Sequence, residues 1–350
     1  MSIRTFLHKL FLWRTAASTA LFAAIFTAGN GEALAADFAA ANIYQHRWNS
    51  INQSVNSRFD TYFTFNPMEG FEEFFGQAPP PPLQFDDESP AAPQPVVQSM
   101  PVKFLANLGN TSLWGNYIGR SGNLIVADDS DLSGTVKSYS NGVQCGFDFA
   151  TFRGFVVGAM FGYENHRSKF EDEKTHTDDY YFGVYTGKQF VNGFDIRGAV
   201  GYGSQKYRFD GDTPSGRTLE ANLEIGRRFY KGPNCSLRPF VAFDYLNNKM
   251  DSAGDDQLKL SQGLLRFGTD AKYVRDRLGL TGLFSFSQGV IGNQMADWYG
   301  ESIFTVGCGG SYTLNTRHNW TLFANYNADI FANGNGDVMH SFALGTQLRF

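Results

Sequence analysis

The segment His340–Phe350 alternates between two kinds of residue, and this pattern constrains the fold more than any other feature. Every second position, counted back from the last residue, is apolar or uncharged: Phe350, Leu348, Thr346, Leu344 and Phe342. A period of two is the period of a β-strand with two unlike faces. A closed transmembrane barrel ends on such a strand, because its last strand pairs with its first and leaves no free edge in lipid. The segment therefore predicts an all-β barrel in an outer membrane.

Residues 1–35 have the pattern of a secretory signal peptide. A start with three basic residues precedes the apolar run 16–28, which is too short to span a bilayer as a stable helix. Ala33 and Ala35 then form a small-x-small cleavage pattern, which predicts a mature chain that begins at Ala36. An uncleaved membrane anchor is the alternative interpretation. Cleavage would place the mature protein beyond the inner membrane of a bacterium with a two-membrane envelope.

The composition agrees with a barrel whose outer surface contacts outer-membrane lipid. The chain has 34 Phe, 16 Tyr and 38 Gly among its 350 residues, and 18% of its residues are charged. Only alternate strand residues of a barrel face lipid, so its average composition is not strongly apolar. No later stretch approaches the run of about 20 apolar residues that a spanning helix needs. The formal net charge of −5 argues against a nucleic-acid partner.

The sequence contains no residue pattern that indicates a catalytic, cofactor or metal site. Cys145, Cys235 and Cys308 are too scattered for a disulfide framework or a metal knuckle. Two of them, Cys145 and Cys308, fall within predicted strands, where a small apolar residue is expected. The six histidines follow no metal-binding spacing. We therefore predict a protein that is not an enzyme and that has no cofactor and no metal.

One group of residues imitates the catalytic rim of outer-membrane hydrolases. His176 is followed by Asp178 and Asp179 in a predicted loop. A solvated polar loop explains these three residues better, because loops are polar by default.

Residues 36–75 form a short exported segment that contains one helical pattern. Its apolar residues recur at spacings of three and four: Tyr44, Trp48, Ile51, Val55 and Phe59. This narrow stripe predicts a docking helix for a surface or periplasmic protein partner, a neighbouring chain or the barrel lumen. A marginal helix that packs on its own protein is the alternative, because isolated helices are weak. An aromatic and acidic stretch follows at 62–75.

Residues 76–110 form a Pro-rich linker. The runs 79–82 and 89–95 contain most of its prolines, which favour a semi-stiff polyproline conformation. The exported segment and the linker together are too short for an enzyme domain with its own core.

Residues 111–350 contain twelve alternating runs that predict an antiparallel barrel. The expected strands are 112–120, 138–151, 154–168, 179–190, 193–209, 216–230, 235–250, 257–274, 279–291, 301–314, 318–331 and 338–350. An even number of strands suits a single-chain bacterial barrel. One face of each run is rich in Gly and Asn, as a narrow lumen requires.

The connections between these runs alternate between short turns and mostly longer loops. The longer ones include Ser121–Lys137 and Lys169–Asp178, and this asymmetry is typical of periplasmic turns and extracellular loops. Basic residues lie beside the short turns: Arg153, Lys231, Arg275, Arg277 and Arg317. Acidic residues gather in the longer loops.

The body of the chain resembles the translocator β-barrel of autotransporters, the type V secretion proteins. The matching landmarks are Leu113–Gly115, Gly142–Asp148, Gly158–Tyr163, Tyr181–Tyr185, Pro239–Tyr245, Leu265–Gly268, Phe323–Tyr326 and Phe350. The resemblance implies a 12-stranded barrel that the barrel assembly machinery inserts and through which an upstream passenger is exported. Phe342, Leu344, Leu348 and Phe350 would form the C-terminal signal that this machinery reads. The helix that plugs the pore in this family has no strong counterpart in Pro101–Asn110.

The sequence thus favours a non-enzymatic outer-membrane barrel that anchors, and translocates or displays, its own short N-terminal segment. A structural or pore-forming barrel without cargo is the first alternative, and a barrel-borne surface hydrolase is the second.

Overall fold

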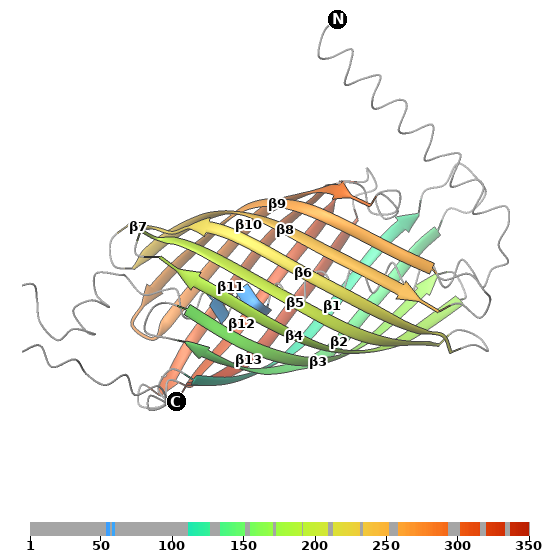
Figure 1. The fold of residues 1–350 in the computed structure, drawn as a ribbon, viewed down its shortest axis with the longest axis horizontal. Helices are drawn as coiled ribbons and strands as arrows, with labels where there is room; N and C mark the ends of the chain where they lie inside the picture. The colour runs from blue at the N-terminus through green and yellow to red at the C-terminus, as the bar shows by residue number, and fades with distance from the viewer. Residues whose placement is uncertain are drawn as a thin grey trace, which may run out of the picture.

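The computed structural model shows a closed antiparallel β-barrel (Figure 1). The structure describes residues 54–56, 58–59, 111–126, 134–150, 155–170, 173–190, 192–208, 213–231, 234–251, 258–292, 302–315, 320–332 and 337–349. The predicted signal peptide, the predicted linker and Phe350 lie outside the described residues. Among the residues that the structure describes, no helix is long and apolar enough to cross a membrane.

The wall contains thirteen strand segments within the described part of the chain, and these form twelve barrel strands. The segments are β1 Thr111–Val126, β2 Gly134–Ala150, β3 Phe155–Phe170, β4 Glu173–Gln189, β5 Phe194–Arg208, β6 Ser215–Arg227, β7 Phe229–Lys231, β8 Cys235–Met250, β9 Leu258–Arg275, β10 Leu278–Ile291, β11 Ser302–Asn315, β12 Trp320–Phe331 and β13 Val338–Arg349. The segments β6 and β7 pair with the same strand, β8, and are interrupted at Arg228, so they make one barrel strand. The predicted fold is confirmed.

The barrel closes between its first and last strands. β1 pairs with β13 from Ser112–Arg349 to Asn123–Val338, and every other strand pairs with its sequence neighbours. The described strands therefore form a closed ladder without a free edge, as a lipid environment demands. Thr111 and Arg349 lie at the same end of the barrel as the connections 151–154, 190–193, 232–234, 276–277 and 316–319, which we call the turn end. The opposite end is called the loop end.

Two of the longer predicted loops are wrong. The loop expected at Ser121–Lys137 is mostly strand, because β1 continues to Val126 and β2 begins at Gly134. The loop expected at Lys169–Asp178 shrinks to residues 171–172, since β3 and β4 pair as far as Phe170–Glu173. Polar side chains led to the loop prediction, but a ladder needs only backbone hydrogen bonds. Barrel strands continue beyond the lipid with polar residues on both faces.

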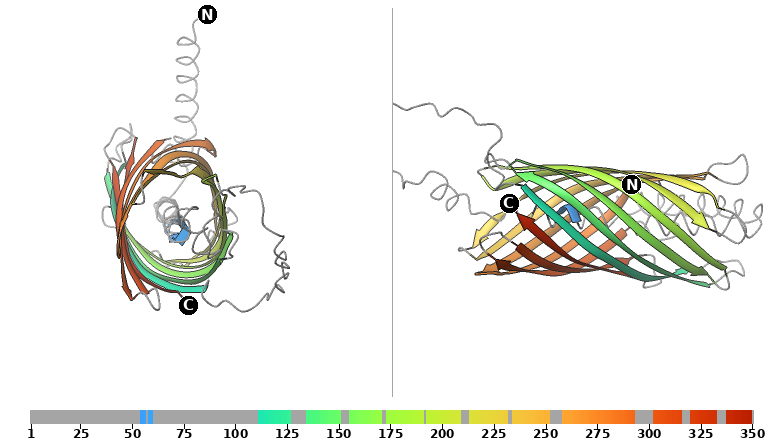
Figure 2. Two further views of the ribbon diagram at one scale, coloured as in Figure 1. Left: turned by 90° about the vertical axis from the view of Figure 1, so that its left-hand side faces the viewer. Right: turned by 90° about the horizontal axis from the view of Figure 1, so that it is seen from below.

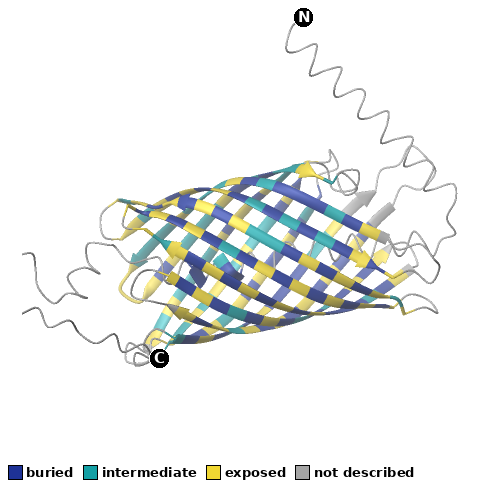
Figure 3. Cartoon of the chain, in the orientation of Figure 1, coloured by how far each residue is buried: buried dark blue, intermediate teal, exposed yellow. Residues whose placement is uncertain are grey.

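Outward-facing and inward-facing residues alternate along most of each strand, which produces the bands of Figure 3. The outward positions in the turn-end half of β3 include the exposed large apolar residues Phe155, Val157 and Phe161. The inward positions of the wall carry buried polar and charged side chains together with glycine. Cys145 and Cys308 lie in strands and are exposed on the outer surface. The packed core of this protein is therefore its lumen.

The closing strand gives a matched pair of test positions. The side chain of Leu344 faces outward with 60% of its surface exposed, whereas that of Gln347 is buried. We expect Leu344→Lys to destabilise the inserted barrel by about 2–4 kcal/mol, because a lysine would face the hydrocarbon. Gln347→Lys keeps its charge in the polar lumen and serves as the control. The yield of heat-modifiable barrel in outer membranes measures the effect, and equal losses for both variants would contradict the register.

Candidate functional site

The lumen contains a short helical piece of the N-terminal segment. Residues 54–56 and 58–59, called the lumen segment, are helical and lie inside the barrel (Figure 2). Val55 and Phe59 are 2% and 0% exposed, and Ser54 and Arg58 are also buried. The part of the predicted docking helix that the structure describes therefore occupies the barrel of its own chain.

Arg58 fixes the lumen segment to the wall by an ion pair. Its Nη2 and Nε atoms lie 2.7 Å and 3.2 Å from Oδ2 of Asp148 on β2. The hydroxyl of Ser112 donates to the same oxygen at 2.6 Å, and Nε1 of Trp114 donates to Oδ1 at 3.1 Å. The hydroxyl of Tyr185 also donates to Oδ1. The buried carboxylate is thus paired with the Arg58 guanidinium and surrounded by further hydrogen-bond donors.

A second polar chain begins at the other end of the lumen segment. The hydroxyl of Ser54 donates to Gln144, and the amide of Gln144 donates to the hydroxyl of Tyr181. Tyr181 donates in turn to Glu164 at 2.7 Å, and Arg120 Nη1 lies 2.8 Å from the other carboxylate oxygen of Glu164. The wall around Ser54 therefore presents a connected network of polar groups.

The apolar side of the lumen segment packs against aromatic wall residues. Phe59 meets Tyr185 edge to face, with ring centroids 5.9 Å apart, and the guanidinium of Arg197 lies 5.6 Å from the Phe59 ring centroid. These contacts belong to one buried cluster: Val55, Phe59, Trp114, Val156, Met160, Tyr181, Tyr185 and Ala199. Gly187 makes room for the ring, because a Cβ atom there would lie 2.3 Å from Phe59 Cε1. The inward-facing glycine is therefore part of the seat for Phe59.

The contacts define the direction in which the lumen segment runs. Ser54 accepts a hydrogen bond from Asn116 at 3.2 Å, whereas Arg58 donates to Ser112 at 3.2 Å. Ser112 is the second residue of β1, at the turn end, and Asn116 lies four residues farther toward the loop end. The segment therefore runs from the loop end toward the turn end as the residue number rises.

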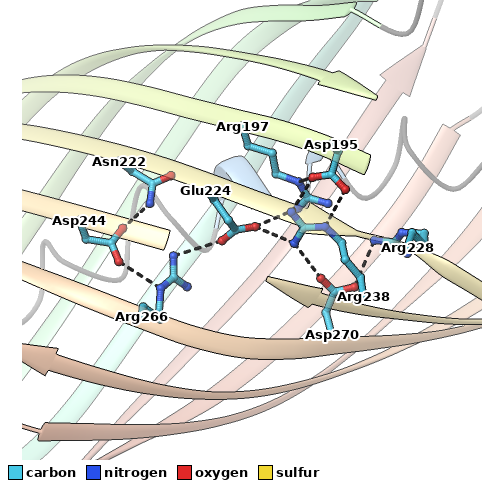
Figure 4. A network of polar contacts seen from close by, with 9 residues as sticks. All are labelled: Asp195, Arg197, Asn222, Glu224, Arg228, Arg238, Asp244, Arg266 and Asp270. Carbon is cyan, nitrogen blue, oxygen red and sulfur yellow. Dashed lines mark hydrogen bonds and ion pairs between the residues drawn. The ribbon is translucent and has the colours of Figure 1, made fainter. Parts of the chain in front are cut away.

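The opposite part of the lumen wall holds a large network of ion pairs (Figure 4). Arg238 lies at its centre. Its Nη2 and Nε atoms lie 2.5 Å and 2.8 Å from Asp195, and its Nη1 atom lies 2.7 Å from Glu224 and 3.1 Å from Asp270. These groups come from β5, β6, β8 and β9, so one guanidinium ties four strands together.

The rest of the network extends from these acids. Arg266 pairs with Asp244 at 3.0 Å and with Glu224 at 3.3 Å, while Asp244 also accepts a hydrogen bond from Asn222. Arg228 pairs with Asp270 at 3.1 Å. Four arginines (Arg197, Arg228, Arg238 and Arg266) thus face four acids (Asp195, Glu224, Asp244 and Asp270), and the drawn network is formally neutral. Arg197 connects it to Phe59 of the lumen segment.

The structure separates the residues that imitated a hydrolase rim. His176, Asp178 and Asp179 lie in β4 and not in a loop, because the strand begins at Glu173. Asp179 faces the lumen, where Gln205 donates to it at 2.7 Å. Asp178 and His176 point to the outer face, where Arg208 pairs with Asp178 at 2.7 Å. Successive strand residues point to opposite sides of a sheet, so the three groups do not meet at one site.

The remaining site residues predicted from the sequence fall into two groups. Tyr44, Trp48, Ile51, Phe350 and the cleavage-site residues Ala33, Ala35 and Ala36 lie outside the described residues. Phe342 and Leu344 face outward on β13, and Leu348 is half-buried. Within the part of the chain that the structure describes, no group of three His, Cys, Asp or Glu side chains is arranged to hold a metal ion.

Sequence reasoning missed the ion pairs of the lumen, and it gave the lumen only as one of several docking places for the helix that contains Val55 and Phe59. The signal was present as charged residues at inward positions of apolar strands, such as Asp148, Glu164 and Asp195. The pore-plugging helix of the family was expected immediately before the barrel, at Pro101–Asn110, and this stretch lies outside the described residues. The lumen instead holds residues much earlier in the chain.

Comparisons with known proteins agree with this geometry. A family model described as "Autotransporter beta-domain" matches residues 113–300. The translocator domain of autotransporter NalP from Neisseria meningitidis superposes with a TM-score of 0.56 at 13% identity, over 69% of this chain and 88% of that one. The beta domain of the Bordetella autotransporter BrkA gives 0.54 at 15% identity, over 69% and 100%. The transport unit of the autotransporter AIDA-I from Escherichia coli gives 0.52 at 14% identity, over 68% and 90%. No curated protein sequence matches this chain.

Proposed function

Since this chain belongs to the autotransporter β-domain family, we propose that it holds its own N-terminal segment in the lumen and presents its mature N-terminus at the cell surface. Autotransporter translocator barrels sit in the outer membrane and serve secretion. The observation that carries the proposal is the buried Arg58–Asp148 ion pair, which fixes an N-terminal residue inside the barrel. The protein acts without catalysis in this proposal.

The direction of the lumen segment supports display of the chain before it. In the proposed orientation the turn end lies in the periplasm and the loop end outside the cell, as turn and loop lengths of outer-membrane barrels favour. Residues before Ser54 then lead toward the outside. The ten steps along β1 from Asn116 to Val126 cover about 33 Å along the strand, and about 25 Å along the barrel axis for strands tilted by 35–45°. The stretch from Ala36 to Ser54 spans about 27 Å as a helix and more if extended, so it reaches the rim.

In the same proposed orientation, residues 60–110 lie on the opposite side of the outer membrane from the mature N-terminus. Phe59 lies in the lumen near the turn end, and Thr111 begins β1 at that end. The stretch between them contains the aromatic and acidic residues 62–75 and the Pro-rich linker 76–110. We assign it to the periplasm, where it is available to a periplasmic protein partner.

The proposal includes the steps that bring the protein to this state. Residues 1–35 serve as a signal peptide with cleavage after Ala35. The barrel assembly machinery then inserts residues 111–350 and recognises the C-terminal strand, with Phe342, Leu344, Leu348 and Phe350 as its signal. The pore-forming alternative fits a lumen packed with Val55, Phe59 and aromatic rings less well.

Thiol labelling on intact cells tests the proposed topology. The native cysteines are first replaced by serine, and Ala39→Cys or Phe75→Cys is then introduced into the full chain. We expect a membrane-impermeant maleimide to label residue 39 on intact cells, and to label residue 75 only after the outer membrane is permeabilised. Asp255→Cys, in the connection between β8 and β9, serves as the loop-end control.

Two outcomes would contradict the proposal. Labelling of residue 75 on intact cells would place the linker outside. A residue 39 that stays unlabelled, while residue 255 is labelled, would show that the N-terminal segment does not reach the surface.

A further inference from the structure

The outer surface of the barrel carries a patch of basic residues near the loop end. Nine exposed lysines and arginines lie within three residues of that end of their strands, all at outward-facing positions: Lys137, Arg167, Lys169, Lys174, Lys206, Arg208, Arg217, Lys249 and Lys259. We call them the basic patch. It extends over β2, β3, β4, β5, β6, β8 and β9, so it covers one continuous side of the wall.

Several members of the patch stand directly opposite one another on neighbouring strands. Lys137 pairs in register with Lys169, which pairs with Lys174 on its other side. Farther around the wall, the register sets Arg217 opposite Lys249, and Lys249 opposite Lys259. Like charges in such positions repel and destabilise a sheet. Each of these two rows of three cations would be stabilised by a nearby group with negative charge.

The described strand ends that carry the patch contain few outward-facing acids. Among the described outward-facing residues near the loop end of these strands, the acids are Asp178 and Asp251. Asp178 pairs with Arg208 at 2.7 Å and accepts hydrogen bonds from Tyr163 at 2.8 Å and Asn165 at 3.0 Å. Asp251 accepts a hydrogen bond from Ser215 at 3.0 Å. No described acid lies in register with the row of Lys137, Lys169 and Lys174.

The other side of the barrel lacks this feature. Near the loop end, the described outward positions of β1, β10, β11, β12 and β13 carry neither lysine nor arginine: Asn123, Gln288, Val290, Ser302, Phe304, Ala328, Ile330, Val338 and His340. The basic residues are therefore concentrated on one side and do not form a ring around the barrel. A ring of basic residues would be explained by general attraction to a charged membrane surface. A patch on one side of the barrel instead indicates a specific binding site.

A strip of exposed aromatic residues lies directly below the patch on the same strands. Tyr139 is 54% exposed and stands opposite Arg167, and Tyr180 is 48% exposed, two residues farther along β4 than Asp178. Phe161, Phe182 and Tyr202 continue the strip toward the middle of the barrel. Aromatic residues at this depth mark the boundary between lipid chains and head groups. An amphipathic molecule bound here would contact the basic patch with its head group and the aromatic rings with its apolar chains.

We propose that the basic patch binds the phosphate groups of an anionic lipid of the outer leaflet, with the acyl chains of that lipid lying against the aromatic strip. The rows of three cations suit a head group with more than one phosphate, since each phosphate accepts hydrogen bonds from several donors. The lipid would offset the repulsion between the facing lysines. The assignment to the outer leaflet rests on the orientation proposed above.

Binding of lipopolysaccharide to the purified full chain in neutral detergent tests the proposal. The test variant is the triple substitution K137Q/K169Q/K174Q, and the matched control is K231Q/R275Q/R277Q, which removes the same charge from exposed positions at the turn end. We expect the test variant to bind roughly tenfold more weakly or worse, and the control to bind like the unmodified protein. Enzymatically dephosphorylated lipopolysaccharide should bind the unmodified protein as weakly as the test variant binds the intact lipid.

Thermal stability supplies a second readout that does not depend on measuring affinity. Addition of lipopolysaccharide should raise the unfolding temperature of the unmodified protein and of the control, and should leave that of the test variant nearly unchanged. Equal binding by all three proteins, equal weakening of both variants, or equal binding of phosphatidylglycerol vesicles would overturn the proposal. These assays are independent of membrane orientation, so their failure is distinguishable from a failure of the proposed topology.

Discussion

Replacement of Arg58 by alanine is expected to free the lumen segment and to open the barrel to ions. Asp148 would remain buried with Ser112, Trp114 and Tyr185 but without a positive charge. Removal of one partner from a buried ion pair costs about 3–5 kcal/mol. This free-energy cost destabilises only the state in which the lumen segment occupies the barrel, because water can reach Asp148 once the segment leaves. The released state should therefore gain a hundredfold or more in population, at about 1.4 kcal/mol for each factor of ten.

Planar-bilayer conductance measures this effect. The unmodified protein should show small and rare openings, whereas the Arg58→Ala protein should show frequent and larger ones. Asn56→Ala, in the same segment, is the matched control, because its side chain is half-buried and carries no charge. A quiet Arg58→Ala protein whose barrel is folded would contradict the role of the ion pair. Large openings in the unmodified protein would favour the pore-forming alternative.

Replacement of Arg238 by alanine should give the largest loss of barrel stability. The substitution leaves Asp195, Glu224 and Asp270 facing one another with one positive charge fewer among them. Uncompensated charge in a buried network costs about 3–5 kcal/mol, and this network links four strands. The temperature at which the barrel loses its heat-modifiable gel mobility should fall accordingly.

An outward-facing arginine provides the comparison for Arg238. Arg275 is exposed at the end of β9, and we expect Arg275→Ala to change the free energy of unfolding by less than about 1 kcal/mol. The double variant Arg238→Ala with Glu224→Gln should recover part of the loss, because it removes a negative charge together with the positive one. If Arg238→Ala is no less stable than Arg275→Ala, the network does not hold the wall together.

The barrel could be predicted from the sequence because its main cause is local. Alternation with a period of two determines which face of each strand meets lipid, and this signal is visible in segments such as Phe155–Tyr163. The strand ends could not be predicted in the same way. Near the loop end, β4 carries polar residues on both faces and β1 ends in the apolar run 124–126, so the alternation ends while the backbone ladder continues to Val126 and Glu173.

The lumen site could be predicted only in part. The apolar stripe that contains Val55 and Phe59 indicates a helix with one face to bury, but the stripe alone does not identify the surface that receives it. That surface is assembled from residues far apart in the chain, since Arg58 meets Asp148 across ninety positions. The same limit applies to Arg238, whose three acidic partners come from three other strands. Single-sequence periodicity carries no information on such pairings.

The placement of the His176, Asp178 and Asp179 side chains could not be predicted from the sequence for a related reason. Closeness in sequence suggested that His176, Asp178 and Asp179 share a site. In a strand, neighbours in sequence lie on opposite faces of the wall, so Asp179 is in the lumen and Asp178 is outside.

Thiol crosslinking within the outer membrane tests the central claim most directly, namely that the N-terminal segment threads the lumen from the loop end to the turn end. Two double variants of the cysteine-free protein are compared, Ser54→Cys with Asn116→Cys and Ser54→Cys with Ser112→Cys. Both wall positions face the lumen on β1 and differ by four residues in height. A short bifunctional thiol reagent should link residue 54 to residue 116 and leave the pair 54 and 112 unlinked. Linkage of residue 54 to residue 112 instead would reverse the direction of the segment, and linkage of neither pair would remove the segment from the lumen.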